Sequence, residues 1–341
     1  MGAAKDLSIK VKKTLITGGG GFVGRAVAAC CLDAGIETVI VGRNFYPDLV
    51  KRGARCIAGN ICDRSIMEKA TRGVDCVFHI AALAGIWGTW PDYYTTNVSG
   101  TENVIRSCTK NEVKVLVYTS TPSVVFDRKN ICAGTEALPY ADNPLCNYAR
   151  SKILAEKLVL SANTAHLRTC ALRPHLIWGP GDPHLIPRLI KRGRLRQLKQ
   201  VGRGDNLVDI SYIDNVAHAH ILAAANLCNS GTAAGRAYFI SQGEPVNLWD
   251  WINNLFNAAD VPPVQSKVSF KTAFALGYLL EIIYALLHSK NEPRMTRFLA
   301  EQLAKSHYFS IDKARSELGY YPLVSTEKGL EKTIEWLRNV T

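Results

Sequence analysis

The chain has 341 residues, of which 47% are hydrophobic and 21% charged, a composition typical of a folded globular protein and unlike that of a disordered one. Lysine and arginine number 41 against 29 for aspartate and glutamate, so the net charge of +12 favours anionic partners. No basic run interleaved with aromatic residues indicates nucleic acid, and ten cysteines without a C-x-x-C pair predict free thiols in a reducing, cytoplasmic compartment.

The first half of the chain alternates strand-like and helix-like segments. Short apolar runs predict strands, at 14–17, 38–41, 54–58, 76–80, 113–119 and 167–173. Segments of helical period lie between them and predict helices, at 22–34, 63–71 with Asp63 as its cap, 97–110 and 147–162. Because repeated βα units of this length require parallel strands with right-handed crossovers, the pattern predicts an α/β fold with a doubly wound parallel sheet, a Rossmann domain.

The second half is less regular. A strand is expected at 206–211, and helices are expected at 214–227, 248–258, 270–287, 294–305 and 326–339. We expect a dinucleotide-binding domain over 1–178, to which segment 206–228 returns, and a smaller, mostly helical substrate-binding lobe over 179–341 that covers a cleft. The basic stretch 188–203 is either a solvated helix face or a contact for a carboxylate, a cofactor phosphate or an anionic membrane.

Two segments bear on targeting and membranes. Residues 1–13 are polar and predict no secretory signal, while Asp6 weakens a myristoylation site at Gly2. The apolar segment 273–287 is shorter than the ~20 residues that span a bilayer and contains Glu281. It predicts a buried helix, a lid over the cleft or a peripheral membrane contact rather than a membrane span.

A glycine-rich turn with the spacing G-x-x-G-x-x-G lies between the first predicted strand and the first predicted helix. Glycine permits positive φ and lets the backbone approach a pyrophosphate, which then lies at the helix N-terminus. A merely flexible turn is the alternative, but the position between strand and helix favours dinucleotide binding. The residues expected to bind the dinucleotide here are Gly18, Gly20, Gly21, Phe22, Val23 and Gly24.

The end of the second predicted strand indicates which dinucleotide is bound. An acidic residue there holds the ribose hydroxyls of NAD, whereas a basic one accepts the extra phosphate of NADP. This chain has Arg43 followed by Asn44 and no acid. We therefore predict NADP, with NAD possible if Arg43 is only a solvated loop residue.

Tyr148 and Lys152 lie four residues apart on the helix predicted at 147–162, so their side chains share one face. A phenol with a pKa of about 10 transfers protons poorly at neutral pH, and we expect the lysine ammonium to lower the pKa of Tyr148. The hydroxyl of Thr121, just after the strand predicted at 113–119, can donate to a substrate oxygen. The combination predicts hydride chemistry on an alcohol or ketone.

The order and spacing of these motifs resemble the extended short-chain dehydrogenase/reductases of the NAD-dependent epimerase/dehydratase superfamily. The matching stretches cover nearly the whole chain, at 17–24, 78–82, 97–101, 118–121, 148–152 and 173–180. Within that family the chain looks like the 3β-hydroxysteroid dehydrogenase branch, and there like 2-alkyl-3-oxoalkanoate reductases and sterol-4α-carboxylate 3-dehydrogenases. The stretches that carry this second likeness are 172–188, 206–209 and 295–300.

The resemblance implies a role for each matching residue. Tyr148 would be the catalytic acid/base and Lys152 its pKa partner and a ribose ligand, while Thr121 would orient the carbonyl and Asn97 would support the site. The remaining cofactor contacts implied are Asn60, Ile61, Ala81, Ala82 and Pro174. Two positions depart from the family pattern: Asn60 replaces an aspartate, which puts its adenine hydrogen bond in doubt, and Asn147 replaces a proline at the helix start.

The resemblance also narrows the reaction. Dehydratases of the superfamily carry an Asp-Glu pair after the hydroxyl residue, whereas here Pro122 and Ser123 follow Thr121. We therefore predict an NAD(P)-dependent oxidoreductase that interconverts a secondary alcohol and a ketone on a bulky hydrophobic substrate, a 3-oxo acid, a lipid or a 3β-hydroxysteroid. A nucleotide-sugar epimerase and a non-catalytic NAD(P) sensor are the alternatives.

Further expectations concern partners and ligands. An aromatic group after the fourth strand is either a substrate pocket or core, and it comprises Trp87, Trp90, Tyr93 and Tyr94. The histidine spacings do not predict a metal site, and His79 is expected to be structural. We expect a cytoplasmic homodimer, with a peripheral membrane contact as a further possibility.

Overall fold

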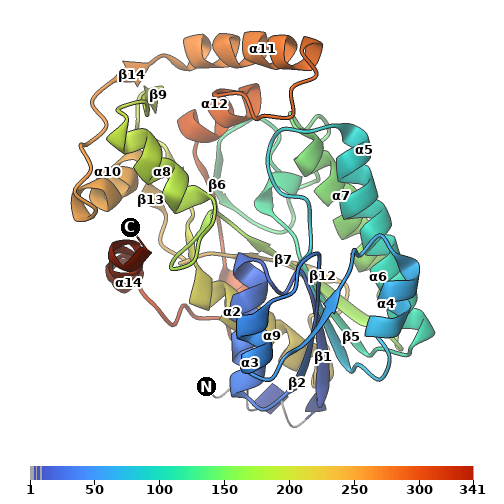
Figure 1. The fold of residues 1–341 in the computed structure, drawn as a ribbon. Helices are drawn as coiled ribbons and strands as arrows, with labels where there is room; N and C mark the ends of the chain where they lie inside the picture. The colour runs from blue at the N-terminus through green and yellow to red at the C-terminus, as the bar shows by residue number, and fades with distance from the viewer. Residues whose placement is uncertain (1–3, 5, 8–9, 341) are drawn as a thin grey trace.

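The computed structural model describes residues 4, 6–7 and 10–340, so the expectation for Gly2 lies outside the described residues. Seven parallel strands form the central sheet, in the order β12-β7-β5-β4-β1-β2-β3 (Figure 1). These strands are β1 (Lys13–Thr17), β2 (Glu37–Gly42), β3 (Arg55–Ala58), β4 (Cys76–His79), β5 (Val115–Thr119), β7 (Arg168–Pro174) and β12 (Arg236–Ile240). The predicted doubly wound parallel sheet is confirmed.

The six predicted strands all lie in this sheet, with ends shifted by at most two residues. The seventh, β12, was not predicted. It pairs with β7 through the register Tyr238 to Leu172, and its last four residues are buried. The apolar run 237–240 between Gly235 and Gly243 was the available signal, but an isolated short run does not show which strand it will join.

Helices cover both faces of the sheet because alternate strand residues point in opposite directions. Ile16 packs with α2 and α9 on one face, and its neighbour Leu15 packs with α4, α6 and α7 on the other. Asp63 caps α4 as predicted, since its carboxylate accepts from the backbone N–H of Ser65 at 2.8 Å. The helices around the sheet are α2 (Phe22–Asp33), α3 (Pro47–Lys51), α4 (Arg64–Ala70), α5 (Trp90–Tyr93), α6 (Gly100–Lys110), α7 (Asn147–Ser161) and, from the second half of the chain, α9 (Ile213–Cys228).

The helix predicted at 97–110 is longer than expected. It begins with α5, continues through the π-helical turn η1 (Tyr94–Ser99) and then becomes α6. The hydroxyl of Thr89 caps α5 by accepting from the N–H of Asp92, and Pro91 follows early in the first turn. Residues 90–96, for which the sequence analysis predicted no helix, are therefore helical as well.

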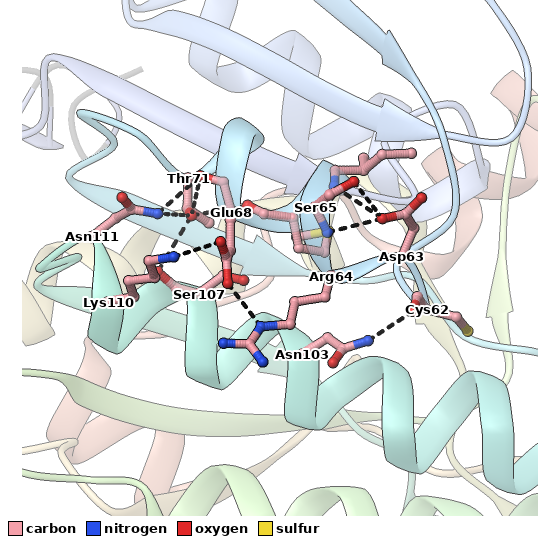
Figure 2. A network of polar contacts seen from close by, with 12 residues as sticks. Cys62, Asp63, Arg64, Ser65, Glu68, Thr71, Asn103, Ser107, Lys110 and Asn111 are labelled. Atoms are coloured by element: carbon pink, nitrogen blue, oxygen red, sulfur yellow. Dashed lines mark hydrogen bonds and ion pairs between the residues drawn. The ribbon is translucent and has the colours of Figure 1, made fainter.

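Polar contacts join α4 to α6 on the outside of the sheet, as Figure 2 shows. Glu68 of α4 pairs with Lys110 of α6 at 2.6 Å. Asn103 of α6 donates from Nδ2 to the carbonyl oxygen of Cys62 at 2.9 Å. These contacts hold the turn after β3, which carries residues 60–61 to the carboxyl edge of the sheet.

The second half forms a smaller lobe around its own core of buried side chains, among them Trp178, Tyr212 and Trp251. Its helices are α8 (Leu185–Arg194), α10 (Leu248–Ala258), α11 (Phe270–Leu286), α12 (Arg297–Ala304) and α14 (Thr326–Val340). Helix α13 (Asp312–Leu318) instead packs against β12 and α9, so it belongs to the core of the sheet. The minor strands are β6 (Ile131–Gly134), β8 (Ile177–Trp178), β9 (Gln200–Val201), β10 (Leu207–Val208), β11 (Ser211–Tyr212), β13 (Val246–Asn247), β14 (Lys267–Val268) and β15 (His307–Phe309). The strand predicted at 206–211 is two short strands, β10 and β11, which belong to different sheets.

All ten cysteines are free thiols. None of the helices in the described part of the chain is long and apolar enough to cross a bilayer.

Candidate active site

A cleft with a volume of about 630 Å³ opens at the carboxyl ends of the central strands. It runs from the glycine turn after β1 to the start of α7, and the segment before α8 forms part of its wall. Thr121 lines the cleft, as do the fourteen residues predicted to bind cofactor: Gly18, Gly20, Gly21, Phe22, Val23, Gly24, Arg43, Asn60, Ile61, Ala81, Ala82, Tyr148, Lys152 and Pro174. The structure therefore brings these residues together on one surface.

The glycine turn is compact and requires glycine at two positions. Gly18 has a φ of 68°, in the left-handed region, and its N–H donates to the carbonyl of Val41 at 2.8 Å. A Cβ at Gly24 would lie 2.1 Å from the carbonyl oxygen of Gly18. Any side chain at position 24 would thus push α2 away from the turn.

The N-terminus of α2 points into the cleft without a side-chain cap. Its N-cap is Gly21, and its first turn contains no acidic residue. The free N–H groups and the positive end of the helix dipole can therefore hold an anion there. The dinucleotide pyrophosphate fits this position.

Arg43 lies exposed beside the cleft, just after β2, and makes no ion pair within the described residues. Arg25, the other arginine near the turn, is held by Asp48 and lies 5.4 Å from the ring centroid of Tyr46. Arg43 is consequently the guanidinium that remains available for a phosphate at this end.

Tyr46 and Asn60 complete the same end of the cleft. A Cβ at Gly20 would lie 1.9 Å from the ring of Tyr46, so the ring packs directly on the glycine turn. The side-chain oxygen of Asn60 accepts from the N–H of Cys62 at 3.0 Å. That oxygen therefore already has one donor, and Tyr46 is a lining residue that the sequence analysis missed.

Tyr148 and Lys152 lie in the first two turns of α7, which begins at Asn147 as predicted. The Asn147 amide donates to the carbonyl of Gly88 at 3.0 Å, so the residue that replaces proline ties the helix start to a neighbouring loop. Lys152 is 2% exposed, and its ammonium donates to the carbonyl of Thr119 at 2.7 Å. The spacing of four residues thus places both side chains at the end of β5.

The expected effect of Lys152 on the phenol is wrong for this structure. Burial raises the pKa of Tyr148 to about 12, and the contact with Thr121 opposes that rise only in part. Burial also lowers the pKa of Lys152 to about 7, although the carboxylate of Glu156 acts in the opposite direction. The phenol is therefore fully protonated at neutral pH, the form that can give a proton away.

Thr121 follows β5 and caps the short 3-10 turn η2 (Pro122–Val124). Its hydroxyl accepts from the N–H of Ser123 at 3.2 Å and donates to the hydroxyl of the same residue. It also lies close enough to Tyr148 to lower the pKa of that phenol. Two hydroxyls, from β5 and α7, thus converge on one point of the cleft.

Asn97 lies behind the cleft wall rather than on it. Its Nδ2 donates to the carbonyl of Leu83 at 3.0 Å and to Ser151 Oγ at 2.9 Å, and its Oδ1 accepts from Leu83 N–H at 2.7 Å. The residue therefore joins the end of β4 to α7. Its contacts are those of a positioning residue.

His79 belongs to a buried chain of hydrogen bonds behind the glycine turn. Its Nδ1 lies 2.8 Å from Thr17 Oγ1, and its Nε2 lies 2.9 Å from Thr101 Oγ1. Thr101 donates its hydroxyl proton to the carbonyl of Asn97, so it accepts from Nε2–H and leaves Nδ1 to accept from Thr17. Burial lowers the pKa of His79 to about 3, which keeps the ring neutral in this structural role.

Glu156 forms a second buried network beneath the site, one that the sequence analysis did not find. Its carboxylate accepts from both Nε and Nη2 of Arg173, at 3.1 and 2.5 Å, and from Tyr140 OH at 2.9 Å. It also accepts from the hydroxyl of Ser120, next to Thr121. The sequence signal for Glu156 was its position four residues after Lys152, which places both side chains on the same face of α7.

Part of the cleft wall outside the glycine turn is mostly apolar. The lining residues there that were not predicted are Leu83, Ala84, Leu176, Ile177, His184 and Leu185. An apolar substrate can lie against this wall with its reacting oxygen toward Tyr148 and Thr121.

The predicted aromatic group does not line the cleft. Tyr93 is buried, and its hydroxyl donates to the carbonyl of Gly85 at 2.7 Å. The ring of Trp90 lies 4.0 Å from the guanidinium carbon of Arg150. Of the four residues only Tyr93 is buried, whereas Tyr94 is 40% exposed and Trp87 contacts Ser289 and Tyr284, so the core interpretation holds for Tyr93 alone.

Histidines elsewhere form no ligand set. His175 and His307 are buried and lie 2.6 Å apart, between Nε2 and Nδ1. Over residues 4, 6–7 and 10–340, no group of three or more histidine, cysteine, aspartate or glutamate side chains is arranged to hold a metal ion.

Comparison with known sequences identifies relatives along nearly the whole chain. The model of the 3-beta hydroxysteroid dehydrogenase/isomerase family matches residues 15–271. A 2-alkyl-3-oxoalkanoate reductase of Shewanella oneidensis is 45% identical over 338 residues, covering 97% of this chain and 87% of the relative. A human sterol-4-alpha-carboxylate 3-dehydrogenase (decarboxylating) is 33% identical and covers 97% of this chain and 90% of that protein.

Solved structures share the fold over a similar length. The structure of gox2253 is 25% identical, with a TM-score of 0.77 over 96% of this chain and 98% of its own. MoeE5 in complex with UDP-glucose and NAD is 24% identical, with a TM-score of 0.74 over 96% of this chain and 99% of that one. The second likeness shows the fold alone.

Proposed function

The chain belongs to the 3-beta hydroxysteroid dehydrogenase/isomerase family and is a nicotinamide-dependent oxidoreductase acting on hydroxyl and keto groups, and from this premise we propose that it reduces the keto group of a bulky, hydrophobic 3-oxo compound with NADPH. One observation carries the proposal: Tyr148, Lys152 and Thr121 line the same cleft as the glycine turn. Proton transfer and nucleotide binding can therefore occur side by side.

In the proposed reaction, a nicotinamide dinucleotide held in the cleft would supply the hydride that reduces the carbonyl carbon. The hydroxyl of Thr121 turns from Ser123 to donate to the carbonyl oxygen, and Tyr148 gives that oxygen its proton. The high pKa of Tyr148 favours this direction, because the phenol holds its proton until the developing alkoxide takes it. Lys152 would hold the nicotinamide ribose through its ammonium, and Asn97 and Glu156 hold the elements that carry these groups.

The substrate class is supported by the wall of the cleft and by the relatives. Leu83, Leu176 and Leu185 offer an apolar surface in the wall of the cleft. The relatives are named for a 2-alkyl-3-oxoalkanoate and for a sterol carboxylate, both of which are hydrophobic. We propose a substrate of this kind, with a keto group at carbon three.

NADPH is proposed over NADH because of Arg43. This guanidinium stands free at the ribose end of the cleft, and no carboxylate follows β2 to hold both ribose hydroxyls. A 2′-phosphate would give Arg43 the partner that it lacks.

The assembly and location are also proposals. The buried thiols suit a reducing cytoplasm. An apolar groove between η1 and α7, lined by Tyr94, Val98, Leu154 and Leu158, suits packing against a second copy. Light scattering of the purified protein, with Leu158→Glu as the interface variant, tests the homodimer.

The test of the reaction compares Tyr148→Phe with the wild type. We expect NADPH oxidation with a 2-alkyl-3-oxo substrate to fall by about three orders of magnitude or more, while NADPH affinity, measured by fluorescence titration, stays within a few-fold. Unchanged turnover would contradict the proposed proton donor. Tyr321→Phe, which removes an exposed phenol outside the cleft, serves as the control.

A further inference from the structure

Helix α11 (Phe270–Leu286) lies along the outer edge of the molecule, with α12 on its inner side (Figure 1). Of its 17 residues only Ala273 and Gly277 are buried. For segment 273–287 the sequence analysis allowed a buried helix, a lid or a membrane contact. The exposure of α11 shows that it is not a buried core helix. It also contributes no side chain to the wall of the cleft.

The inner side of α11 is docked by two residues. A Cβ at Gly277 would lie 2.6 Å from the backbone of Thr296, so glycine permits the close approach of the two helices. Glu281 accepts from both the backbone N–H and Nε of Arg297, each at 2.7 Å, at the start of α12. The single acid of this apolar segment thus faces inward and caps a neighbouring helix.

The outer side of α11 is apolar along its length. Its side chains stay exposed to a degree unusual for leucine, with Leu279 at 54% and Leu286 at 73%. The other large apolar side chains exposed on this helix and at its end are Leu276, Tyr278, Ile282, Ile283 and Leu287. A surface of this kind requires a partner.

Cations stand at both ends of this surface. Lys267 and Lys271 lie at the N-terminal end, Lys290 and Arg294 follow the C-terminal end, and all four are exposed without an ion pair in the described part of the chain. The nearby acid Glu292 is already paired with Arg188. The apolar face is thus framed by four uncompensated positive charges.

The charge distribution distinguishes between occupants. If two copies of the chain packed through α11, parallel or antiparallel, the cations at each end of one helix would face cations of the other. A bilayer containing anionic lipid instead offers acyl chains to the apolar side and phosphates to both cationic ends. The surface therefore fits a lipid bilayer better than a second copy.

We propose that α11 is an interfacial helix that rests the protein on a membrane containing anionic lipid. The inference deepens the proposed function, on which the purpose of the contact rests, because a hydrophobic 3-oxo substrate partitions into the bilayer. The helix is also linked to the substrate side of the cleft. Trp87 Nε1 donates to the carbonyl of Ser289 at 3.0 Å, and its ring lies 6.3 Å from that of Tyr284.

The link has a consequence for substrate entry. Trp87 belongs to the loop after β4, in which Leu83 and Ala84 line the cleft. With α11 on the bilayer, this loop lies beside the membrane surface, and a lipid substrate can pass to the cleft without crossing open water. The contact would raise the local concentration of substrate rather than alter the chemistry.

The test measures binding to vesicles by flotation, with the full chain. We expect it to bind phosphatidylcholine vesicles that contain roughly one third phosphatidylglycerol, to bind pure phosphatidylcholine vesicles more weakly, and to lose affinity in high salt. Leu279→Glu combined with Ile283→Glu should weaken binding about tenfold or more, because each places a charge at the acyl boundary. Leu323→Glu, at a leucine that is 61% exposed outside this surface, is the matched control.

Three results would overturn the proposal: no binding of the wild type to the anionic vesicles, equal binding by the double variant, or conversion of a wild-type dimer to a monomer by the double variant. NADPH oxidation with a short, water-soluble 3-oxo ester is measured on every variant and should not change. Loss of that activity in the wild type would instead contradict the proposed reaction, so the two failures are distinguishable.

Discussion

Glu156 of α7 and Arg173 of β7 form a bidentate ion pair directly beneath the candidate site, with 0% and 4% of their side chains exposed. The same carboxylate holds the hydroxyl of Ser120 at the end of β5. Three elements that carry residues of the candidate site are therefore joined at one buried anion. The pair contributes to the precision of the site rather than to its chemistry.

Glu156→Gln should lower the free energy of unfolding by about 3–5 kcal/mol, because it leaves the guanidinium of Arg173 buried without its counter-charge. Urea denaturation followed by circular dichroism measures the change. Tyr140→Phe removes one neutral donor from the same carboxylate and should cost only about 1 kcal/mol. Equal losses for the two variants would show that the charge of Arg173 is compensated in another way.

Arg43→Ala should raise the KM for NADPH by roughly ten- to a hundred-fold, since a charge-assisted hydrogen bond to the 2′-phosphate contributes about 1.5–3 kcal/mol. The KM for NADH should stay nearly constant, because NADH lacks that phosphate. Steady-state kinetics with both nucleotides measures the difference. Arg52→Ala, which removes an exposed arginine paired with Asp33 outside the cleft, is the control. A parallel loss for both nucleotides in Arg43→Ala would contradict the assignment of NADP.

The rate of NADPH-driven reduction should fall as the pH rises through about 7, where Lys152 loses its charge. The sign follows from the proposed role: the protonated ammonium would hold the nicotinamide ribose, and the neutral amine would hold it less well. Single-turnover rates measured across this range test the prediction. Lys152→Met should be slow and should lack this inflection. If Lys152→Met still shows the inflection near pH 7, a group other than Lys152 causes it.

Asp209→Asn should stabilise the protein at pH 8 and have little effect at about pH 4. Burial raises the pKa of Asp209 from 3.8 to about 7, so between these values the unfolded chain releases this proton while the folded protein keeps it. Stability from this group is therefore lost as the pH rises through that window, by at most about 4 kcal/mol. The amide of the variant can still accept from Phe309 N–H, as Oδ2 does now at 2.7 Å.

Thermal unfolding at both pH values measures the effect of Asp209→Asn. Asp205→Asn, an exposed acid paired with Arg203, is the control and should leave the pH dependence as it is. If Asp209→Asn leaves the pH dependence of stability unchanged, that dependence arises from other buried groups.

Much of the nucleotide-binding half could be predicted because its signals are local. Six strands of the central sheet follow from short apolar runs, and the glycine turn and the Tyr148–Lys152 spacing follow from residues a few positions apart. The strand β12 could not be placed, since its position depends on pairing with β7, which is distant in the sequence. The same holds for Glu156, whose partners Ser120 and Arg173 lie 36 and 17 residues away.

The sequence by itself determined the parallel sheet, the glycine turn and the placement of Tyr148 and Lys152 on one face of α7, because period, glycine content and spacing act over a few residues. Only the tertiary structure decided the protonation state of that pair, since the pKa of Tyr148 depends on how much solvent the packed elements remove. It likewise decided that α11 lies outside the core. An apolar helix has the same sequence whether or not another element covers it, and the packing of distant segments determines which occurs.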